Sequence, residues 1–357
     1  FCTFATNIQY KSKMTPIYNQ LLIPFLTAMV VAITMGGSGT APAFSASYGA
    51  NVMRKSLIPG LFGIMVFVGA FLAGKKTAST MGSGILPAEY MDFTVVSIAL
   101  FSIAVTMLIS NISGIPQSTS QAAVLALAAP ALYFNKLDTH NLFVEIIPAW
   151  FILPIISYFL SFFAGKYIYQ PMRRRGLTIQ RAQNENKRHI WDIVLVIMAL
   201  YVSFAIGSNN VANAAGPLYT MTINELHIRE SDHIVILMLA TLVVAPCFGI
   251  GASLFGHKIL KNTGKEIILF GKFEAVIIAF ISGSLLLLAS VVKGIPTSLV
   301  QVNVAAILGI GVAKMGHKNI FRKTQVKRFF TMWMIAPVIS FLLSLLLIFL
   351  ADKANLL

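Results

Sequence analysis

The sequence predicts an all-α integral membrane protein in which two five-segment halves form an inverted-topology repeat, with broken or re-entrant helices at a central site. Three observations predict this fold. The chain of 357 residues is 57% hydrophobic and 11% charged, with a mean hydropathy of +0.80, which is far more apolar than a soluble domain. Ten apolar stretches follow one another, and four landmarks of the first half recur in order in the second half.

The ten stretches are the candidate membrane segments. A helix needs about 20 apolar residues to cross the hydrocarbon core, and several stretches reach that length while others fall short. The stretches lie at about 21–35, 57–74, 93–110, 115–134, 142–165, 191–206, 234–255, 273–292, 295–312 and 329–350.

The distribution of positive charge predicts the orientation. Lys and Arg are enriched in cytoplasmic loops, and 19 of the 27 fall in four loops that share one side if all ten stretches span the membrane. The sequence therefore predicts that the N-terminus and the C-terminus are both outside. The net charge of +15 then reflects topology, and we expect no nucleic-acid partner. The four loops are 51–56, 166–190, 256–272 and 313–328.

The landmarks recur after about 180 residues, which indicates an internal repeat. Because each copy holds five stretches, the second copy begins on the opposite side of the membrane, as in many secondary transporters. The matched landmarks are GGSGTAPA (36–43) with GSNNVANA (207–214), GKK (74–76) with GHK (256–258), GIPQS (114–118) plus Gln121 with GIPTS (294–298) plus Gln301, and Trp150, Pro154 and Ser157 with Trp333, Pro337 and Ser340.

This repeat sets the domain boundaries. A cleaved signal peptide at residues 14–46 is disfavoured, because the second copy repeats that segment. The predicted units are an N-terminal extension, native or not, at 1–20, the first repeat at 21–165, a basic cytoplasmic linker at 166–190, the second repeat at 191–350 and a C-terminal tail at 351–357.

Two kinds of helix break mark the candidate site. The first stretch of each copy is short and runs into a Gly-rich or Asn-rich motif, at 36–43 and 207–214, and such interruptions point to a transporter's binding site. Each GIPxS motif predicts a new helix after its proline, and a helix N-terminus with free N–H groups suits an anion. The candidate anion-binding residues are Ser38, Gly39, Thr40, Ser118, Thr119, Asn209, Asn210, Asn213 and Ser298.

Other polar residues have more than one interpretation. Small polar residues in membrane helices also serve close packing, which is the preferred role for Ser102, Thr106 and Ser282. Gln121 and Gln301 either line the site or brace it. The predicted coupling carboxylates, for which a purely interfacial position is the alternative, are Asp92 and Glu274.

Enzyme and metal motifs are missing from the sequence. No HExxH, GxSxG or Walker pattern occurs, and the two cysteines, Cys2 and Cys247, are far apart. We therefore expect no enzymatic activity, no bound metal and no cofactor.

The segment GSNNVANAAGPL at 207–218 resembles the signature of the inorganic phosphate transporter (PiT) family, which reads approximately GANDVANA, and the GIPxS pairs match that family's PVSTT elements. The resemblance implies an inverted-repeat symporter that holds the anion and its coupling ion at the breaks. Two departures stand out. The signature aspartate is Asn210 in one copy and Gly39 in the other, and Val66 and Phe248 replace a family glutamate.

The lost carboxylates bear on substrate and coupling. Sulfate only accepts hydrogen bonds, whereas phosphate at neutral pH carries an O–H donor that needs an acceptor. A site of hydroxyls, amides and backbone N–H groups therefore fits sulfate. The pattern GxSGxA at 36–41 also resembles the family's bacterial sulfate permease branch. We expect a permease of the cytoplasmic membrane that imports sulfate, with thiosulfate as a further candidate, coupled to protons or alternatively to Na+. A phosphate symporter and a passive anion channel are the open alternatives for the function. A homodimer is the open alternative for the assembly.

Overall fold

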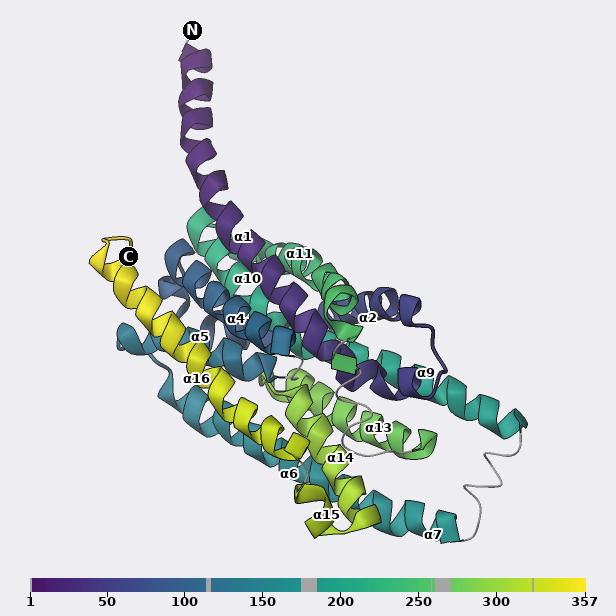
Figure 1. Ribbon diagram of the computed structural model, residues 1–357. Coiled ribbons are helices and arrows are strands. Elements are labelled where there is room, and N and C mark those ends of the chain that lie inside the picture. The colour runs from purple at the N-terminus through teal and green to yellow at the C-terminus, as the bar shows by residue number, and fades with distance from the viewer. Residues whose placement is uncertain (1, 114–116, 175–184, 258, 261–270, 323) are drawn as a thin grey trace.

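The chain folds as a bundle of tilted helices, shown in Figure 1 as a computed structural model. The structure describes residues 2–113, 117–174, 185–257, 259–260, 271–322 and 324–357. Within these ranges all longer elements are helices, so the predicted all-α class is confirmed. The first GIP, residues 114–116, and the centre of the basic linker, residues 175–184, lie outside the described residues.

The described part of the first half contains seven α-helices and two π-helical segments. They are α1 (Cys2–Gly49), α2 (Ile58–Ala73), α3 (Lys75–Ser83), α4 (Phe93–Ser113), α5 (Thr119–Tyr133), η3 (Asn141–Ile146), α6 (Ile147–Phe163), η4 (Ala164–Tyr169) and α7 (Gln170–Arg174). Short 3-10 turns stand at Lys55–Leu57 and Ala88–Tyr90.

The second half follows a similar order. Its elements are α9 (Glu185–Asn210), α10 (Ala212–Leu226), η5 (Glu230–Asp232), α11 (His233–Leu254), α13 (Lys272–Leu288), η6 (Ala289–Lys293), α14 (Leu299–Met315), α15 (His317–Phe321) and α16 (Thr324–Lys353). Figure 1 places both chain ends at the upper left, and α7 and the start of α9 at the lower right.

Eight described segments are long and apolar enough to cross a membrane. Two helices are shorter: α5 has 15 residues and α14 has 17. At 1.5 Å per residue they measure about 23 and 26 Å, less than a hydrocarbon core of about 30 Å. Both follow GIPxS motifs, where the sequence predicts a helix start. The eight segments are Leu21–Gly49, Lys55–Ala73, Phe93–Ser113, Asn141–Met172, Ile190–Leu226, Glu230–Leu254, Lys272–Lys293 and Trp333–Lys353.

The predicted break at 36–43 is wrong, because α1 continues through this segment to Gly49. The polar groups are satisfied inside the helix: Ser38 Oγ donates to the Met35 carbonyl at 3.1 Å, and Thr40 Oγ1 donates to the Gly36 carbonyl at 2.7 Å. At 207–214 the predicted break shrinks to one residue, Val211, which keeps helical dihedrals of φ −61° and ψ −34°.

The glycines of these motifs serve close helix packing. A Cβ added at Gly36 would overlap the carbonyl oxygen of Phe248 on α11, and one added at Gly207 would overlap the carbonyl oxygen of Val66 on α2. The two contacts match, because Gly36 and Gly207 are aligned landmarks and Phe248 lies 182 residues after Val66. Small residues of this kind let membrane helices approach closely.

A second matched contact joins the short helices to the long ones. Ser157 on α6 donates to the Val302 carbonyl on α14 at 2.8 Å, and Ser340 on α16 donates to the Ala122 carbonyl on α5 at 2.9 Å. Equivalent residues of the two halves thus make equivalent bonds into the opposite half. The inverted orientation of the halves stays a prediction.

Candidate functional site

Buried polar side chains from α5 and from the junction of α9 with α10 meet in one group. Asn210 Nδ2 donates to Thr119 Oγ1 at 2.9 Å, and Asn213 Nδ2 donates to Ser120 Oγ at 3.1 Å. Ser120 Oγ in turn donates to Asn209 Oδ1 at 3.3 Å. All five residues are at most 4% exposed. We call residues 118–121, 209, 210 and 213 the central cluster.

Asn209 also holds a segment of the second half that we call the hairpin tip, residues 289–298, between α13 and α14. Its Nδ2 donates to Ser290 Oγ and to the Ile295 carbonyl, both at 2.9 Å. Its Oδ1 accepts from the Thr297 backbone N–H at 3.0 Å. A carbonyl only accepts and an N–H only donates, so these bonds identify the nitrogen and the oxygen of the Asn209 side-chain amide.

The fixed amide sets the direction of the neighbouring hydrogen bonds. Because Asn209 Oδ1 accepts, the Ser120 hydroxyl donates to it, and Ser120 Oγ is left to accept from Asn213 Nδ2. This order leaves Asn213 Oδ1 buried with no hydrogen-bond partner among the described residues, and Asn210 Oδ1 is in the same position. Buried acceptors without partners are rare and call for a ligand, an ion or a water.

Two helix N-termini face the central cluster. Ser118 caps α5 by accepting from the Gln121 N–H at 3.3 Å, and Ser298 caps α14 by accepting from the Gln301 N–H at 3.3 Å. The two glutamine side chains bind each other, with Gln121 Nε2 to Gln301 Oε1 at 3.1 Å and the reverse bond at 2.9 Å. The pair therefore braces two positive helix ends against each other.

Three predicted site residues make no described hydrogen bond to this cluster. Ser38, Gly39 and Thr40 are buried, but the described hydrogen bonds of the two hydroxyls stay within α1. A Cβ added at Gly39 would meet apolar atoms, 3.3 Å from Phe62 and 3.7 Å from Ile206. The second half carries amides at the positions matched to Ser38 and Gly39, namely Asn209 and Asn210, and both join the cluster.

The predicted coupling carboxylates also lie away from the cluster. Asp92 accepts from the Val95 N–H at 2.8 Å and caps α4, so it lies about 30 Å along that helix from the other end. Burial, and then the charge of Glu225, raise the pKa of Asp92, although hydrogen bonds from the backbone oppose the shift. Its coupling role stays a prediction.

Glu274 is 2% exposed and pairs with Lys314 Nζ at 2.8 Å. Lys314 lies near the end of α14, about 24 Å along the helix from Ser298. Glu274 therefore joins the far ends of α13 and α14, and its coupling role also stays a prediction.

Several polar residues of the region were not predicted from the sequence. They include Ser120 and Ser290, and also Ser110, which donates to Gln117 Oε1 in the first half. Ser290 and Thr297 follow Ser110 and Gln117 by the same 180 residues. Gln117 and Thr297 lie within the GIPxS landmark, and extending the alignment four residues upstream would have matched Ser110 with Ser290.

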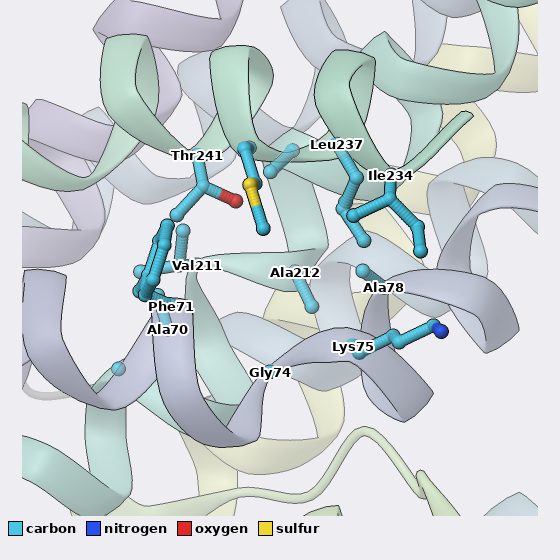
Figure 2. A pocket seen from close by; sticks show the side chains of 13 residues that line it. Ala70, Phe71, Gly74, Lys75, Ala78, Val211, Ala212, Ile234, Leu237 and Thr241 are labelled. Carbon is cyan, nitrogen blue, oxygen red and sulfur yellow. The ribbon is translucent and has the colours of Figure 1, made fainter. Parts of the chain in front are cut away.

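Figure 2 shows a separate side pocket of about 70 Å³ between α2, α3, α10 and α11. It borders the Asn-rich motif at Val211, but its lining is mostly apolar. Lys75 and Thr241 supply its only polar side chains, too few to replace the hydration of an oxyanion. Among the described residues, no group of three or more His, Cys, Asp or Glu side chains could hold a metal ion.

The chain matches known transporters over nearly its whole length. A model of the phosphate transporter family matches residues 35–344. The sulfate permease CysP of Bacillus subtilis is 31% identical over 337 residues, which cover 94% of this chain and 89% of that protein. A putative phosphate permease of Thermococcus kodakarensis is 23% identical over 402 residues, covering 92% of this chain and 98% of the relative.

A solved structure has the same fold. It is described as the sodium-dependent phosphate transporter, with a TM-score of 0.80 at 19% identity, over 94% of this chain and 99% of that one. The matched family, the eight apolar helices and the buried polar cluster agree with one another. The chain is a multi-span membrane transporter and belongs to the phosphate transporter family.

Proposed function

We propose that this transporter is a secondary carrier that imports sulfate through the central cluster. The observation that carries the proposal is the pair of capped helix starts, α5 and α14, joined by Gln121 and Gln301 beside three buried asparagines. Helix N-termini, hydroxyls and amides give a fully ionised oxyanion the donors it needs after it loses water.

The uncharged character of the cluster supports a dianion. No Asp or Glu belongs to it, and a buried carboxylate next to a dianion would add strong repulsion in a region of low dielectric constant. The likeness to the sulfate permease of Bacillus subtilis points the same way.

Phosphate is the second candidate, and one observation favours it. The buried acceptor Asn213 Oδ1 has no partner among the described residues, and hydrogen phosphate carries an O–H that could donate to it. The putative phosphate permease of Thermococcus kodakarensis and the fold neighbour agree with this candidate.

For coupling, we propose a proton gradient, with Na+ as the alternative. The positions of the family aspartates are Asn210 and Gly39, which removes the carboxylate that often helps to hold Na+. The fold neighbour is described as sodium-dependent, so the two cations must be tested separately.

We also propose that the two halves are inserted in opposite orientations, with both chain ends outside the cytoplasmic membrane. The close helix contact at Gly36 matches the one at Gly207, and the hydrogen bond of Ser157 matches that of Ser340. These two matches support a two-fold relation between the halves. Both ends of the chain lie on the same side in Figure 1. Single cysteines introduced at each end should then react with an impermeant thiol reagent in intact cells, and labelling only after lysis would overturn this orientation.

Uptake of labelled sulfate into proteoliposomes tests the function. We expect saturable uptake, counterflow, and competition by thiosulfate or molybdate stronger than that by phosphate. Asn210→Ala and Ser298→Ala should abolish uptake, whereas the matched control Ser102→Ala should preserve it, because Ser102 bonds only within α4. Near-normal uptake in both site variants would refute the site, and non-saturating current without counterflow would indicate a channel.

Discharging the proton gradient tests the coupling. Uptake should collapse when the gradient is removed and should persist without Na+. The reverse result would assign Na+ as the coupling ion.

A further inference from the structure

The hairpin tip has a second set of contacts, away from the central cluster, and they involve two lysines. Lys76, at the start of α3, donates from Nζ to the Val292 carbonyl at 3.2 Å. Lys293, on the tip itself, contacts both carboxylate oxygens of Glu145 at 3.4 and 3.3 Å. Val292 and Lys293 are neighbours on the tip. The ammonium group of Lys76 on α3 contacts the first, and the carboxylate of Glu145 on η3 contacts the second.

The backbone of the tip also lies directly on α3. Gly294 has φ +67°, and a Cβ added there would lie 2.8 Å from the carbonyl oxygen of Lys76. The left-handed dihedral and the close approach both require glycine at this position. Lys76 therefore touches the tip with its backbone as well as with its ammonium group.

These lysines are exposed although they occur among membrane helices. The side chain of Lys293 is 60% exposed and that of Glu145 is 34% exposed, and Lys76 is also exposed. Charged groups in membrane segments face water-filled spaces rather than lipid, because lipid exposure is costly. We therefore place Lys76 and Lys293 at a water-exposed surface that borders the hairpin tip.

Both ammonium groups can take a further ligand. An ammonium group has three donors, and the bond from Lys76 to the tip uses one of them, on a neutral carbonyl. The Lys293–Glu145 pair is long and exposed, and such pairs contribute little free energy. With two lysines and one carboxylate the group keeps a net positive charge, which favours a dianion over a monovalent anion.

We propose that Lys76 and Lys293 form a docking site for a small dianionic oxyanion, separate from the central cluster. The anion binds the free donors of Lys76 and displaces Glu145 from Lys293. The displacement of Glu145 releases the tip from η3, so docking favours opening of the path to the cluster. On the predicted orientation this site faces outward. The inference rests on the proposed oxyanion transport.

Uptake kinetics give the first test. Lys76→Gln and Lys293→Gln should each raise the KM for labelled sulfate by roughly tenfold, as expected for the loss of one charged hydrogen bond, with a smaller change in maximal rate. The rise of KM with ionic strength should also flatten in both variants. Unchanged KM values in both variants would overturn the docking site.

Lys75 provides the matched control. It is the adjacent lysine and is also exposed, but it lies on the rim of the side pocket, as Figure 2 shows. Lys75→Gln should leave the KM and its salt dependence unchanged. An equal effect of all three substitutions would mean that general surface charge attracts the anion, which also overturns the proposal.

A thiol-protection experiment separates this inference from the proposed function. Glu145→Cys, which keeps both lysines and places the thiol beside Lys293, is introduced into a chain whose Cys2 and Cys247 are replaced by serine and which also carries Asn210→Ala to stop uptake. Added sulfate should slow the reaction of the new thiol with an impermeant reagent by several-fold, and chloride at equal ionic strength should not. No protection, while the wild type transports sulfate, refutes docking alone; no uptake by the wild type refutes the proposed function.

Discussion

The first and second halves of this transporter share their packing but differ in how they reach the central cluster. Gly36 and Gly207 make the same close helix contact, yet Asn209 extends three hydrogen bonds to the hairpin tip while its counterpart Ser38 bonds only within α1. The comparison shows that a repeated scaffold can carry a one-sided site. Symmetric glycines pack the helices, and asymmetric amides form the polar cluster.

Removing Asn209 should break this comparison most severely. Asn209→Ala leaves the buried Thr297 N–H without its partner, which costs about 1–3 kcal/mol, and removes one of the two hydrogen bonds that the Ile295 carbonyl accepts. We expect loss of uptake and a clear fall in Tm in detergent. Ser38→Ala, at the matched position, should change Tm little, and equal effects of the two substitutions would disprove the asymmetry.

Substituting the paired glycines tests the shared scaffold. Gly36→Ala and Gly207→Ala each force a methyl group onto a carbonyl oxygen of the opposite half, and overpacking of this kind costs about 1–3 kcal/mol. Both variants should lose thermal stability to a similar extent. A tolerated Gly36→Ala beside a destabilised Gly207→Ala would mean that the halves do not pack equivalently.

The glutamine pair joins the two halves, so removing either glutamine should have the same effect on uptake. Gln121→Ala and Gln301→Ala each leave the other amide buried without its reciprocal partner. We expect similar reductions in uptake from the single variants and almost no further loss in the double variant, because contacting residues are not additive. Additive losses would show that each glutamine acts separately.

The smallest effects are expected at the matched serines. Ser157→Ala and Ser340→Ala each remove one hydrogen bond to a carbonyl of a short helix, worth about 1 kcal/mol. Thermal unfolding should show two small and similar shifts in Tm with uptake retained. A large loss of uptake in only one variant would place that serine in the transport path.

The sequence predicted the positions of the membrane helices and of the cluster better than it predicted the helix breaks and the partners of single residues. Hydropathy located the ten stretches, and the GIPxS motifs located the starts of α5 and α14, because proline and serine act on local backbone geometry. The break at 36–43 was wrong, since hydroxyl bonds within α1 and a neighbouring helix stabilise the continuous form. The packing of a neighbouring helix against this segment is a tertiary effect, which leaves no local signal in the sequence.

The matched acids show a second limit of the sequence. Asp92 and Glu274 correspond in the repeat, but one caps a helix near Glu225 and the other pairs with Lys314. The reach of Asn209 across 81 residues to Ser290 was equally hidden. Alignment gives equivalent positions, whereas the partners depend on what the opposite half presents.

The short length of α5 and α14 bears on the energetics of the proposed import. Because the Gln121–Gln301 bonds join the starts of the two short helices, we expect much of the membrane voltage to fall near their junction. Moving one elementary charge through 100 mV is worth about 2.3 kcal/mol, so a dianion entering a negative interior works against about 4.6 kcal/mol. The cluster contributes no fixed counter-charge; two co-transported cations would make the cycle electroneutral, and a third would let the voltage itself drive accumulation.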